Sequence, residues 1–308
     1  MIKSLLITGS TGMVGRNIIE YFEKNSKYQL FAPWHSELDL LNYSSVSSYI
    51  AQMKPDMIIH CAGVVGGIQA NIANPVKFLV DNAQMGQNIV LAAQANHVLQ
   101  LLNLGSSCMY PRNAPNPLTE EMILTGQLEP TNEGYALAKI MTAKLCSYIS
   151  QTSPLKYKTL IPCNLYGKYD KFDPEKSHMI PSAIRKIAIA QQQKIKSVEI
   201  WGNGTARREF MYAEDLADAI AFVIEYFDEI PDFLNVGLGY DYTINEYYHA
   251  IAEVIGFKGG FEHDVTKPIG MKQKLVCMKK LSDLGWQPKH DLISGLTKTY
   301  QYYMENYL

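Results

Sequence analysis

The sequence predicts an α/β protein built on a doubly wound parallel sheet, with a smaller C-terminal lobe. A short apolar run at residues 4–8 leads directly into a glycine-rich turn and then into a helical pattern. Short apolar runs and helical patterns alternate up to about residue 165. Such alternation is typical of a parallel sheet with helices on both faces. After residue 166 the regularity falls, which indicates a second unit woven from several segments.

The expected strands of the sheet are short, apolar and bounded by polar or turn residues. They lie at residues 4–8, 29–32, 57–60, 101–104 and 159–162. Helical patterns lie between them, through Ile18, Ile19 and Phe22 and at residues 46–53, 82–95 and 133–150. Asn82 opens the third of these patterns, and we expect its side chain to cap that helix.

In the C-terminal half, residues 169–178 are polar and loop-like. Helices are expected at residues 180–193, 213–227, 244–255 and 293–306, and strands at 198–201 and 233–236. We expect residues 1–165 and about 205–236 to form the sheet domain. Residues from about 166 to 204 and from 237 to 308 would form the lobe, which closes over the ends of the strands.

The composition argues against several classes of protein. The chain has 308 residues and a formal net charge of −2, so no basic field indicates binding to nucleic acid or to an anionic membrane. No apolar run is long enough to indicate a membrane span. The five cysteines include no C-x-x-C pair. They indicate reduced thiols in a cytoplasmic protein, with neither a disulfide framework nor a metal site.

The glycine-rich turn has the character of a dinucleotide site. Residues 9–15 read G-S-T-G-M-V-G and lie between the first strand and the first helix. Glycines in this setting allow a tight bend and a close approach of the backbone to a pyrophosphate at the helix N-terminus. The spacing is G-x-x-G-x-x-G and differs from the G-x-G-x-x-G of most dinucleotide dehydrogenases. The turn therefore predicts a Rossmann-like domain that binds a dinucleotide.

Tyr135 and Lys139 stand four residues apart in a helical pattern, so they share one face of the helix. A fixed ammonium beside a phenol favours the phenolate and lowers the phenol pKa from about 10 toward the working pH. Such a phenol can protonate a carbonyl oxygen while hydride arrives at the carbon. Together with the dinucleotide turn, this pair predicts an oxidoreductase.

Several further blocks share a resemblance to one family. They are residues 104–111, 128–135, 162–167, 177–181, 201–205 and 208–210. In this order the blocks resemble the extended short-chain dehydrogenase/reductase family and, within it, the GDP-L-fucose synthases. The likeness covers nearly the whole chain. It implies NADPH-dependent reduction of the 4-keto group of a GDP-4-keto sugar in nucleotide-sugar biosynthesis. It also implies a homodimer, for which helices 82–95 and 133–150 are the candidates.

The resemblance implies a role for each matched catalytic residue. Tyr135 would donate a proton to the 4-keto oxygen and Ser106 would hydrogen-bond the same oxygen. Lys139 would tune Tyr135 and hold the nicotinamide ribose. Cys108 and His178 would act as base and acid in epimerisation at the carbons beside the ketone, because a carbonyl acidifies the neighbouring C–H bonds.

The resemblance also implies binding residues. Those for the cofactor follow the strand ends and the glycine-rich turn: Gly9, Thr11, Gly12, Met13, Val14, Gly15, His35, Ser36, Asp39, Leu40, Leu104, Gly105, Lys139, Pro162, Asn164, Leu165 and His178. Those for the substrate are Ser107, Asn164, Lys186, Trp201, Arg208 and Lys274. An indole can cover a base or sugar, and a guanidinium can bind a pyrophosphate through two hydrogen bonds. His60 is expected to be a packed residue at a strand end.

The chain departs from this family pattern near the adenosine ribose. Related fucose synthases place arginines near the 2′-phosphate, where this chain has Thr11 and, after the second strand, Pro33, Trp34 and His35. An acidic residue immediately after that strand would favour NADH, and none stands there. NADPH is therefore expected from the resemblance, while NADH is left open.

A second group of departures concerns the sugar. Gly134 replaces a common proline, Lys171, Asp173 and Lys176 change the loop before His178, and Ile269 stands where an aspartate is common. An apolar side chain cannot accept a hydrogen bond from a sugar hydroxyl. Three alternatives stay open: a carbon-4 reductase of a GDP-4-keto-heptose or another GDP-deoxy-sugar without epimerisation, an epimerase that retains NAD, and a non-catalytic dinucleotide sensor.

Overall fold

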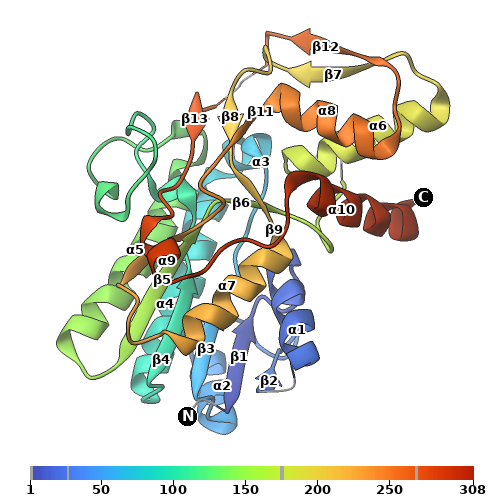
Figure 1. Cartoon of the computed structure of the whole chain (residues 1–308). Helices are drawn as coiled ribbons and strands as arrows, with labels where there is room; N and C mark the ends of the chain where they lie inside the picture. Colours follow the sequence, from blue (N-terminus) through green and yellow to red (C-terminus); the bar gives the residue numbers. More distant parts are fainter. Residues whose placement is uncertain (1–2, 26–27, 174–176, 268–269) are drawn as a thin grey trace.

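The computed structural model describes residues 3–25, 28–173, 177–267 and 270–308, and its centre is a six-stranded sheet (Figure 1). The strands run in the order β10-β5-β4-β3-β1-β2, and all neighbours are parallel. They are β1 (Ser4–Thr8), β2 (Gln29–Phe31), β3 (Met57–His60), β4 (Gln100–Leu104), β5 (Lys156–Pro162) and β10 (Phe233–Val236). The predicted α/β class and the parallel, Rossmann-like sheet are confirmed.

Helices cover both faces of the sheet. The helix α1 (Met13–Asn25) packs against α7 (Ala213–Glu225), while α4 (Pro75–Ala95) lies between α2 (Tyr43–Met53) and α5 (Glu133–Thr152) (Figure 1). The alternation of side chains along β1 explains the two layers. Leu5 and Ile7 pack in one apolar core with Ile18 of α1, whereas Leu6 packs in another with Val46 of α2.

The strand order creates a crevice at one end of the sheet. From β1 the chain passes to β2 at the edge and then returns to β3 on the other side of β1. Such a switch of direction leaves space beyond the carboxyl ends of the two central strands, where ligands of α/β sheets bind. In this chain those ends are the glycine-rich turn after β1 and the loop after β3.

A smaller lobe lies beyond this end of the sheet (Figure 1). Its core is formed by α6 (Met179–Gln193), α8 (Ile244–Ile255) and α10 (Leu292–Tyr307). Short strands complete it as separate small sheets: β7 (Ser197–Trp201) with β12 (Gly260–Asp264), and β8 (Arg207–Arg208) with β11 (Tyr242–Thr243) and β13 (Gln273–Lys274).

The connection between the two cores runs through further short elements. The strands β6 (Asn164–Tyr166) and β9 (Phe210–Tyr212) pair with each other. The helix α9 (Lys279–Asp283) contacts β10, and Leu281 and Trp286 belong to the core of the large sheet. The domain boundaries stay a prediction.

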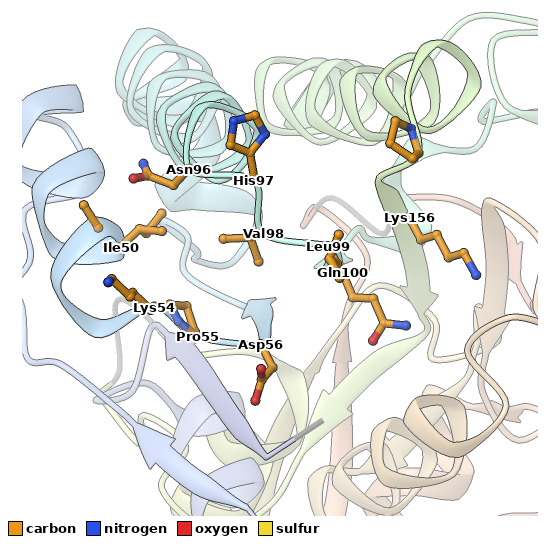
Figure 2. Close-up of a pocket in the computed structure, with 12 residues that line it drawn as sticks. Ile50, Lys54, Pro55, Asp56, Asn96, His97, Val98, Leu99, Gln100 and Lys156 are labelled. Carbon is orange, nitrogen blue, oxygen red and sulfur yellow. The ribbon is translucent and has the colours of Figure 1, made fainter. Parts of the chain in front are cut away.

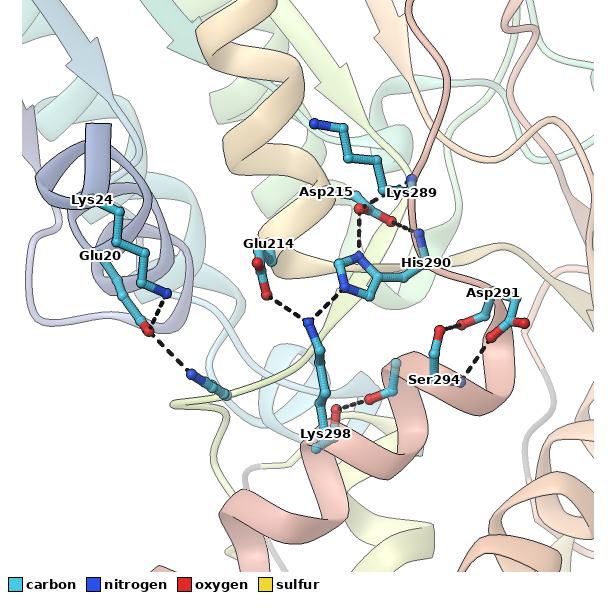
Figure 3. Close-up of polar contacts among 12 residues, drawn as sticks. Glu20, Lys24, Glu214, Asp215, Lys289, His290, Asp291, Ser294 and Lys298 are labelled. Carbon is cyan, nitrogen blue, oxygen red and sulfur yellow. Dashed lines mark hydrogen bonds and ion pairs between the residues drawn. The ribbon is translucent and has the colours of Figure 1, made fainter. Parts of the chain in front are cut away.

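Polar side chains join α7 to α10 (Figure 3). Asp215 accepts a hydrogen bond from the backbone N–H of His290 and lies 2.7 Å from its Nδ1. Lys298 of α10 lies 2.7 Å from Nε2 of the same imidazole and 3.3 Å from Glu214 of α7. Asp291 caps α10 by accepting from the N–H of Ser294 at 2.8 Å. The lobe is thereby fixed to a helix that packs on the sheet.

One expected helix boundary is wrong. The helix α4 begins at Pro75, so Asn82 lies in its interior and does not cap it. Proline suits the first turn of a helix, because it has no N–H to leave unpaired there. The Asn82 side chain instead accepts from the N–H of Val64 at 2.8 Å and donates to the Val64 carbonyl at 3.1 Å. It thereby holds the loop that follows β3.

Candidate active site

Tyr135 and Lys139 lie one turn apart near the N-terminus of α5. The Lys139 Nζ is 5.8 Å from the centre of the Tyr135 ring and donates a hydrogen bond to the carbonyl of Leu104 at 2.9 Å. That carbonyl ends β4, so the hydrogen bond fixes the lysine at the carboxyl end of the sheet. The two side chains therefore face the region where the crevice opens.

The pKa of Tyr135 is raised, and the expectation that Lys139 lowers it is wrong. Burial disfavours the phenolate and is the largest cause, and a negative charge at Cys108 acts in the same direction. A hydrogen bond with Ser106 favours the phenolate but does not offset burial. Burial also lowers the pKa of Lys139 to about 8. Tyr135 is therefore a protonated phenol at neutral pH, beside an ammonium.

Ser106 and Cys108 lie directly after β4, at a short 3₁₀ helix, η1 (Ser107–Met109). The Ser106 hydroxyl accepts from the backbone N–H of Cys108 at 3.2 Å. The Cys108 sulfur in turn accepts from the Asn132 amide at 3.2 Å and from the Lys274 ammonium at 3.4 Å. Asn132 and the charged Lys274 thus both donate to the Cys108 sulfur, and both lie outside the loop that carries it.

His178 reaches the same site from the lobe, at the N-terminus of α6. Burial lowers its pKa, and the positive charges of Lys171 and Lys274 lower it further. The imidazole is therefore neutral at pH 7. A cavity of about 200 Å³ brings together the five predicted catalytic residues, Ser106, Cys108, Tyr135, Lys139 and His178.

A second cavity of about 520 Å³ adjoins the first and follows the glycine-rich turn. His178 and Met13 are among the residues that line both cavities. Most predicted cofactor residues line one or the other. Those in the second cavity are Gly9, Thr11, Gly12, Met13, Val14, Gly15, His35, Asp39 and Leu40, and those in the first include Leu104, Gly105, Pro162, Asn164 and Leu165. Ser36 and Ser107 lie outside both linings.

The backbone of this second cavity fits a dinucleotide. Gly9 has a φ of +74°, and a Cβ there would lie 2.8 Å from the backbone of Ala62. A Cβ at Gly15 would collide with the Gly9 carbonyl. The backbone of the turn therefore carries no side chain at Gly9 and Gly15, beside the N-terminus of α1. Bare backbone at a helix N-terminus is the arrangement that binds a pyrophosphate.

The predicted substrate residues fall into separate groups. Lys274 and Arg208 are paired across the adjacent strands β13 and β8, and Lys274 contacts the predicted catalytic residue Cys108. Lys186 lies 5.6 Å from the centre of the Trp201 ring, farther out in the lobe. Ile269 and Lys176 lie outside the described residues.

The structure adds residues that sequence reasoning missed. Asn132 contacts Cys108, Phe78 packs edge-on against Tyr135, and Asn71 lines the catalytic cavity. Asn132 lies inside the matched block 128–135, so its position in the sequence was a usable signal. Phe78 belongs to α4 and Asn71 to α3 (Ile68–Ala73), and neither lies in a matched block.

Two other features are not part of the site. His60 is buried, its Nδ1 lies 2.8 Å from the Thr8 hydroxyl, and burial lowers its pKa to about 3, as expected for a packed neutral residue. A cavity of about 760 Å³ opens at the amino ends of β3, β4 and β5, between residues such as Asp56, His97 and Lys156 (Figure 2). Ligands of α/β sheets bind at the opposite ends of the strands.

The described part of the chain has no helix long and apolar enough to span a membrane. Within the same residues no cluster of three metal-ligating side chains occurs. The five cysteines are free thiols.

Comparisons with known proteins identify the family. The NAD dependent epimerase/dehydratase family matches residues 5–237. The chain is 57% identical over 301 residues to a GDP-L-colitose synthase of Yersinia pseudotuberculosis, and the match covers 97% of each chain. It is 50% identical over 302 residues to a GDP-L-fucose synthase of Azorhizobium caulinodans, with 98% of this chain and 96% of the relative covered.

A solved structure agrees. The GDP-mannoheptose C4 reductase of Campylobacter jejuni, with NADP bound, superposes with a TM-score of 0.89 at 30% identity and 98% coverage of both chains. The resemblance inferred from the sequence blocks is confirmed, and the chain belongs to the NAD dependent epimerase/dehydratase family, that is, to the extended short-chain dehydrogenases/reductases.

Proposed function

We propose that the protein catalyses the NADPH-dependent reduction of the 4-keto group of a GDP-4-keto sugar in nucleotide-sugar biosynthesis. One observation carries the proposal: Ser106, Tyr135 and Lys139 meet in a cavity that adjoins the cavity along the glycine-rich turn. Relatives similar over the whole chain are named GDP-L-colitose synthase and GDP-L-fucose synthase. Their names supply the GDP-sugar class of the substrate.

The residues suit carbonyl reduction. Bound NADPH supplies the hydride. Tyr135 is a phenol at neutral pH because burial raises its pKa, so it holds the proton that the keto oxygen requires. Ser106, hydrogen-bonded to Tyr135, would contact the same oxygen. The Lys139 ammonium would stabilise the phenolate that remains after proton transfer.

We further propose that epimerisation beside the ketone accompanies reduction. The Cys108 sulfur accepts from Lys274 and Asn132, and an ammonium donor suits a thiolate that removes a proton. His178 enters the same cavity from the lobe and would return a proton in its imidazolium form, which its lowered pKa makes the minor form at pH 7. A carbon-4 reductase without epimerisation is the second candidate, because the chain is similar throughout to a GDP-mannoheptose C4 reductase.

We also propose that the active form is a cytoplasmic homodimer. Exposed apolar side chains recur at helical spacing on α4 (Val76, Val80) and on α5 (Leu137, Met141), and these two helices pack against each other. Such a stripe on two adjacent helices suits a four-helix interface between two copies.

Oxidation of NADPH by purified protein with a GDP-4-keto-6-deoxy sugar tests the main proposal. Steady consumption is expected, and a GDP-sugar reduced at carbon 4 should accumulate. An epimerase that retains NAD would give no net oxidation, and a sensor would bind NADPH without turnover. Either result would refute the proposal.

NMR of the product formed in deuterated water decides between the two candidates. Deuterium at the carbons beside carbon 4 would report epimerisation. The Cys108→Ser variant should lose this label while it still reduces a substrate that needs no epimerisation, because Tyr135 and Lys139 are unchanged. If wild-type product carries no label beyond background, the enzyme is a carbon-4 reductase alone.

A further inference from the structure

The dinucleotide cavity has few sources of positive charge for a pyrophosphate. Its charged lining residues in the described part of the chain are the lysines Lys77 and Lys171 and the acids Asp39, Asp81 and Asp170. Lys77 forms an ion pair with Asp81 on the same helix, α4. A pyrophosphate carries a negative charge on each phosphate, and burying it without compensation is costly. The position of Lys171 therefore matters.

Lys171 belongs to a strap, residues 167–173, that is held against α1. The Lys168 carbonyl accepts from the Asn17 amide at 3.1 Å. The Tyr169 hydroxyl donates to Glu20 at 3.1 Å, and the Arg16 guanidinium lies 3.7 Å from the centre of the Tyr169 ring. All three contacts fall on the first turns of α1, directly after the glycine-rich turn. The strap is thus fixed beside the helix end that fits a pyrophosphate.

The strap is also fixed on the side of the lobe. Phe172 packs against Tyr303 and Tyr307 of α10, with ring centres 4.9 and 5.0 Å away. Tyr169 packs against Tyr302 at 5.3 Å. Lys171 lies between these two anchors, is exposed, and lines the cavity. Its backbone is therefore positioned before any ligand binds, while its exposed side chain can approach one.

Two neighbours place the Lys171 ammonium along the cavity. Its charge lowers the pKa of His178, and His178 lines both cavities. Lys171 therefore lies near His178, at the junction of the two cavities. Burial raises the pKa of the adjacent Asp170 to about 7. Below that pH the Asp170 carboxyl is mostly neutral and leaves the charge of Lys171 uncancelled, whereas above it the carboxylate offsets part of that charge.

We propose that Lys171 binds the pyrophosphate of the dinucleotide, opposite the N-terminus of α1. The inference rests on the proposed function for the identity of the cofactor. In this arrangement the strap gives the lobe a direct contact with the cofactor. The positive charge at the pyrophosphate would therefore come from the strap, residues 167–173.

Cofactor binding without sugar substrate tests the proposal. The dissociation constants of NADPH and of NADH would be measured by quenching of protein fluorescence, for wild type, Lys171→Met and Lys171→Arg. Lys168→Met is the matched control, since Lys168 lies in the same strap, pairs with Glu20 at 3.1 Å and does not line the cavity. Lys171→Met should raise the dissociation constants of both nucleotides about tenfold, as expected for loss of one charge-assisted contact. Lys171→Arg should restore most of the affinity, and Lys168→Met should bind like wild type.

Three results would overturn the assignment. The first is that Lys171→Met binds both nucleotides like wild type. The second is that it loses affinity for NADPH alone, which would place the lysine at the 2′-phosphate. Equal losses in Lys168→Met would mean that the strap, not the Lys171 charge, is responsible. The proposed function fails separately: if wild type binds NADPH and Lys171→Met weakens it while no GDP-4-keto sugar is reduced, the Lys171 assignment stands and the substrate assignment falls.

Discussion

Burial governs the charges of the side chains in the catalytic cavity. It raises the pKa of Tyr135, lowers that of Lys139 to about 8 and lowers that of His178. At neutral pH the cavity therefore holds a phenol, an ammonium and a neutral imidazole. Reduction of a ketone needs the first two in these states, because the phenol gives up a proton and the ammonium stabilises the phenolate.

The phenol of Tyr135 is the first target at this scale. We expect Tyr135→Phe to reduce the rate of carbonyl reduction by at least about 100-fold, because general acid catalysis supplies roughly 100- to 10,000-fold. NADPH affinity should stay close to that of wild type, since the ring and its contact with Phe78 are kept. Stopped-flow measurement of hydride transfer and a binding titration check both parts. A variant that turns over like wild type would exclude Tyr135 as the acid.

The charge of Lys139 predicts a pH dependence. A lysine with a lowered pKa of about 8 is an ammonium below that pH and neutral above it. We therefore expect kcat/KM for reduction to fall as the pH rises through about 8. Lys139→Arg keeps the charge at higher pH and should shift the fall upward, whereas Lys139→Met should be slow at every pH. If kcat/KM of Lys139→Arg falls at the same pH as in wild type, the pH dependence belongs to another group.

At the scale of elements, α4 and α5 form the wall that carries the catalytic pair. Their close approach depends on Gly86, where an added Cβ would collide with the Thr142 side chain of α5. Asn82, one turn earlier in α4, holds the loop after β3 at Val64. The packing of these two helices thus positions both Tyr135 and the loop after β3, which lines both cavities.

Enlarging Gly86 should separate the helices. We expect Gly86→Ala to lower the free energy of unfolding by about 1–3 kcal/mol, the usual cost of overpacking a core. The double variant Gly86→Ala/Thr142→Ala should recover part of the loss, because it removes the Thr142 atoms that the new Cβ meets first. Urea denaturation of the two single variants and the double variant measures the coupling. Strict additivity would show that the clash is relieved elsewhere.

At the scale of the whole molecule, the sheet and the lobe each supply part of the site. Cys108 and Tyr135 come from the sheet side, while His178 and Lys274 come from the lobe. The network of Asp215, His290 and Lys298 fixes the two parts together (Figure 3). The exposed apolar stripe on α4 and α5 lies on the outer surface of this assembly, where a second copy can cover it.

The proposed dimer can be tested at that stripe. Val80→Glu combined with Met141→Glu should convert a dimer into a monomer, because both side chains are exposed and a buried unpaired carboxylate is costly. Leu99→Glu is the control, since Leu99 is 64% exposed but lies outside the two helices. Light scattering after size exclusion gives the masses. A monomeric wild type, or a dimer that survives the double change, would refute this interface.

Local signals predicted much of the fold and part of the site. Periodicity located the main strands and helices because its period depends on residues close in sequence, and four-residue spacing placed Tyr135 and Lys139 on one face. The two-residue strands β8, β11 and β13 were missed, since such pairs are stabilised by partners far along the chain and leave no periodic pattern. The helix start at Pro75 was missed because the expected pattern began only at Asn82.

The sequence by itself determined the α/β class, the glycine-rich turn and the residues of the catalytic pair. Each depends on neighbours within a few positions, so the order of residues is enough to predict it. Tertiary structure alone decided how those residues behave. Lys274 contacts Cys108 across 166 positions of the chain, and the pKa of Tyr135 rises where its helical spacing from Lys139 predicted a fall. Burial and long-range contacts arise only when the sheet and the lobe close together, and they set the charges on which the chemistry depends.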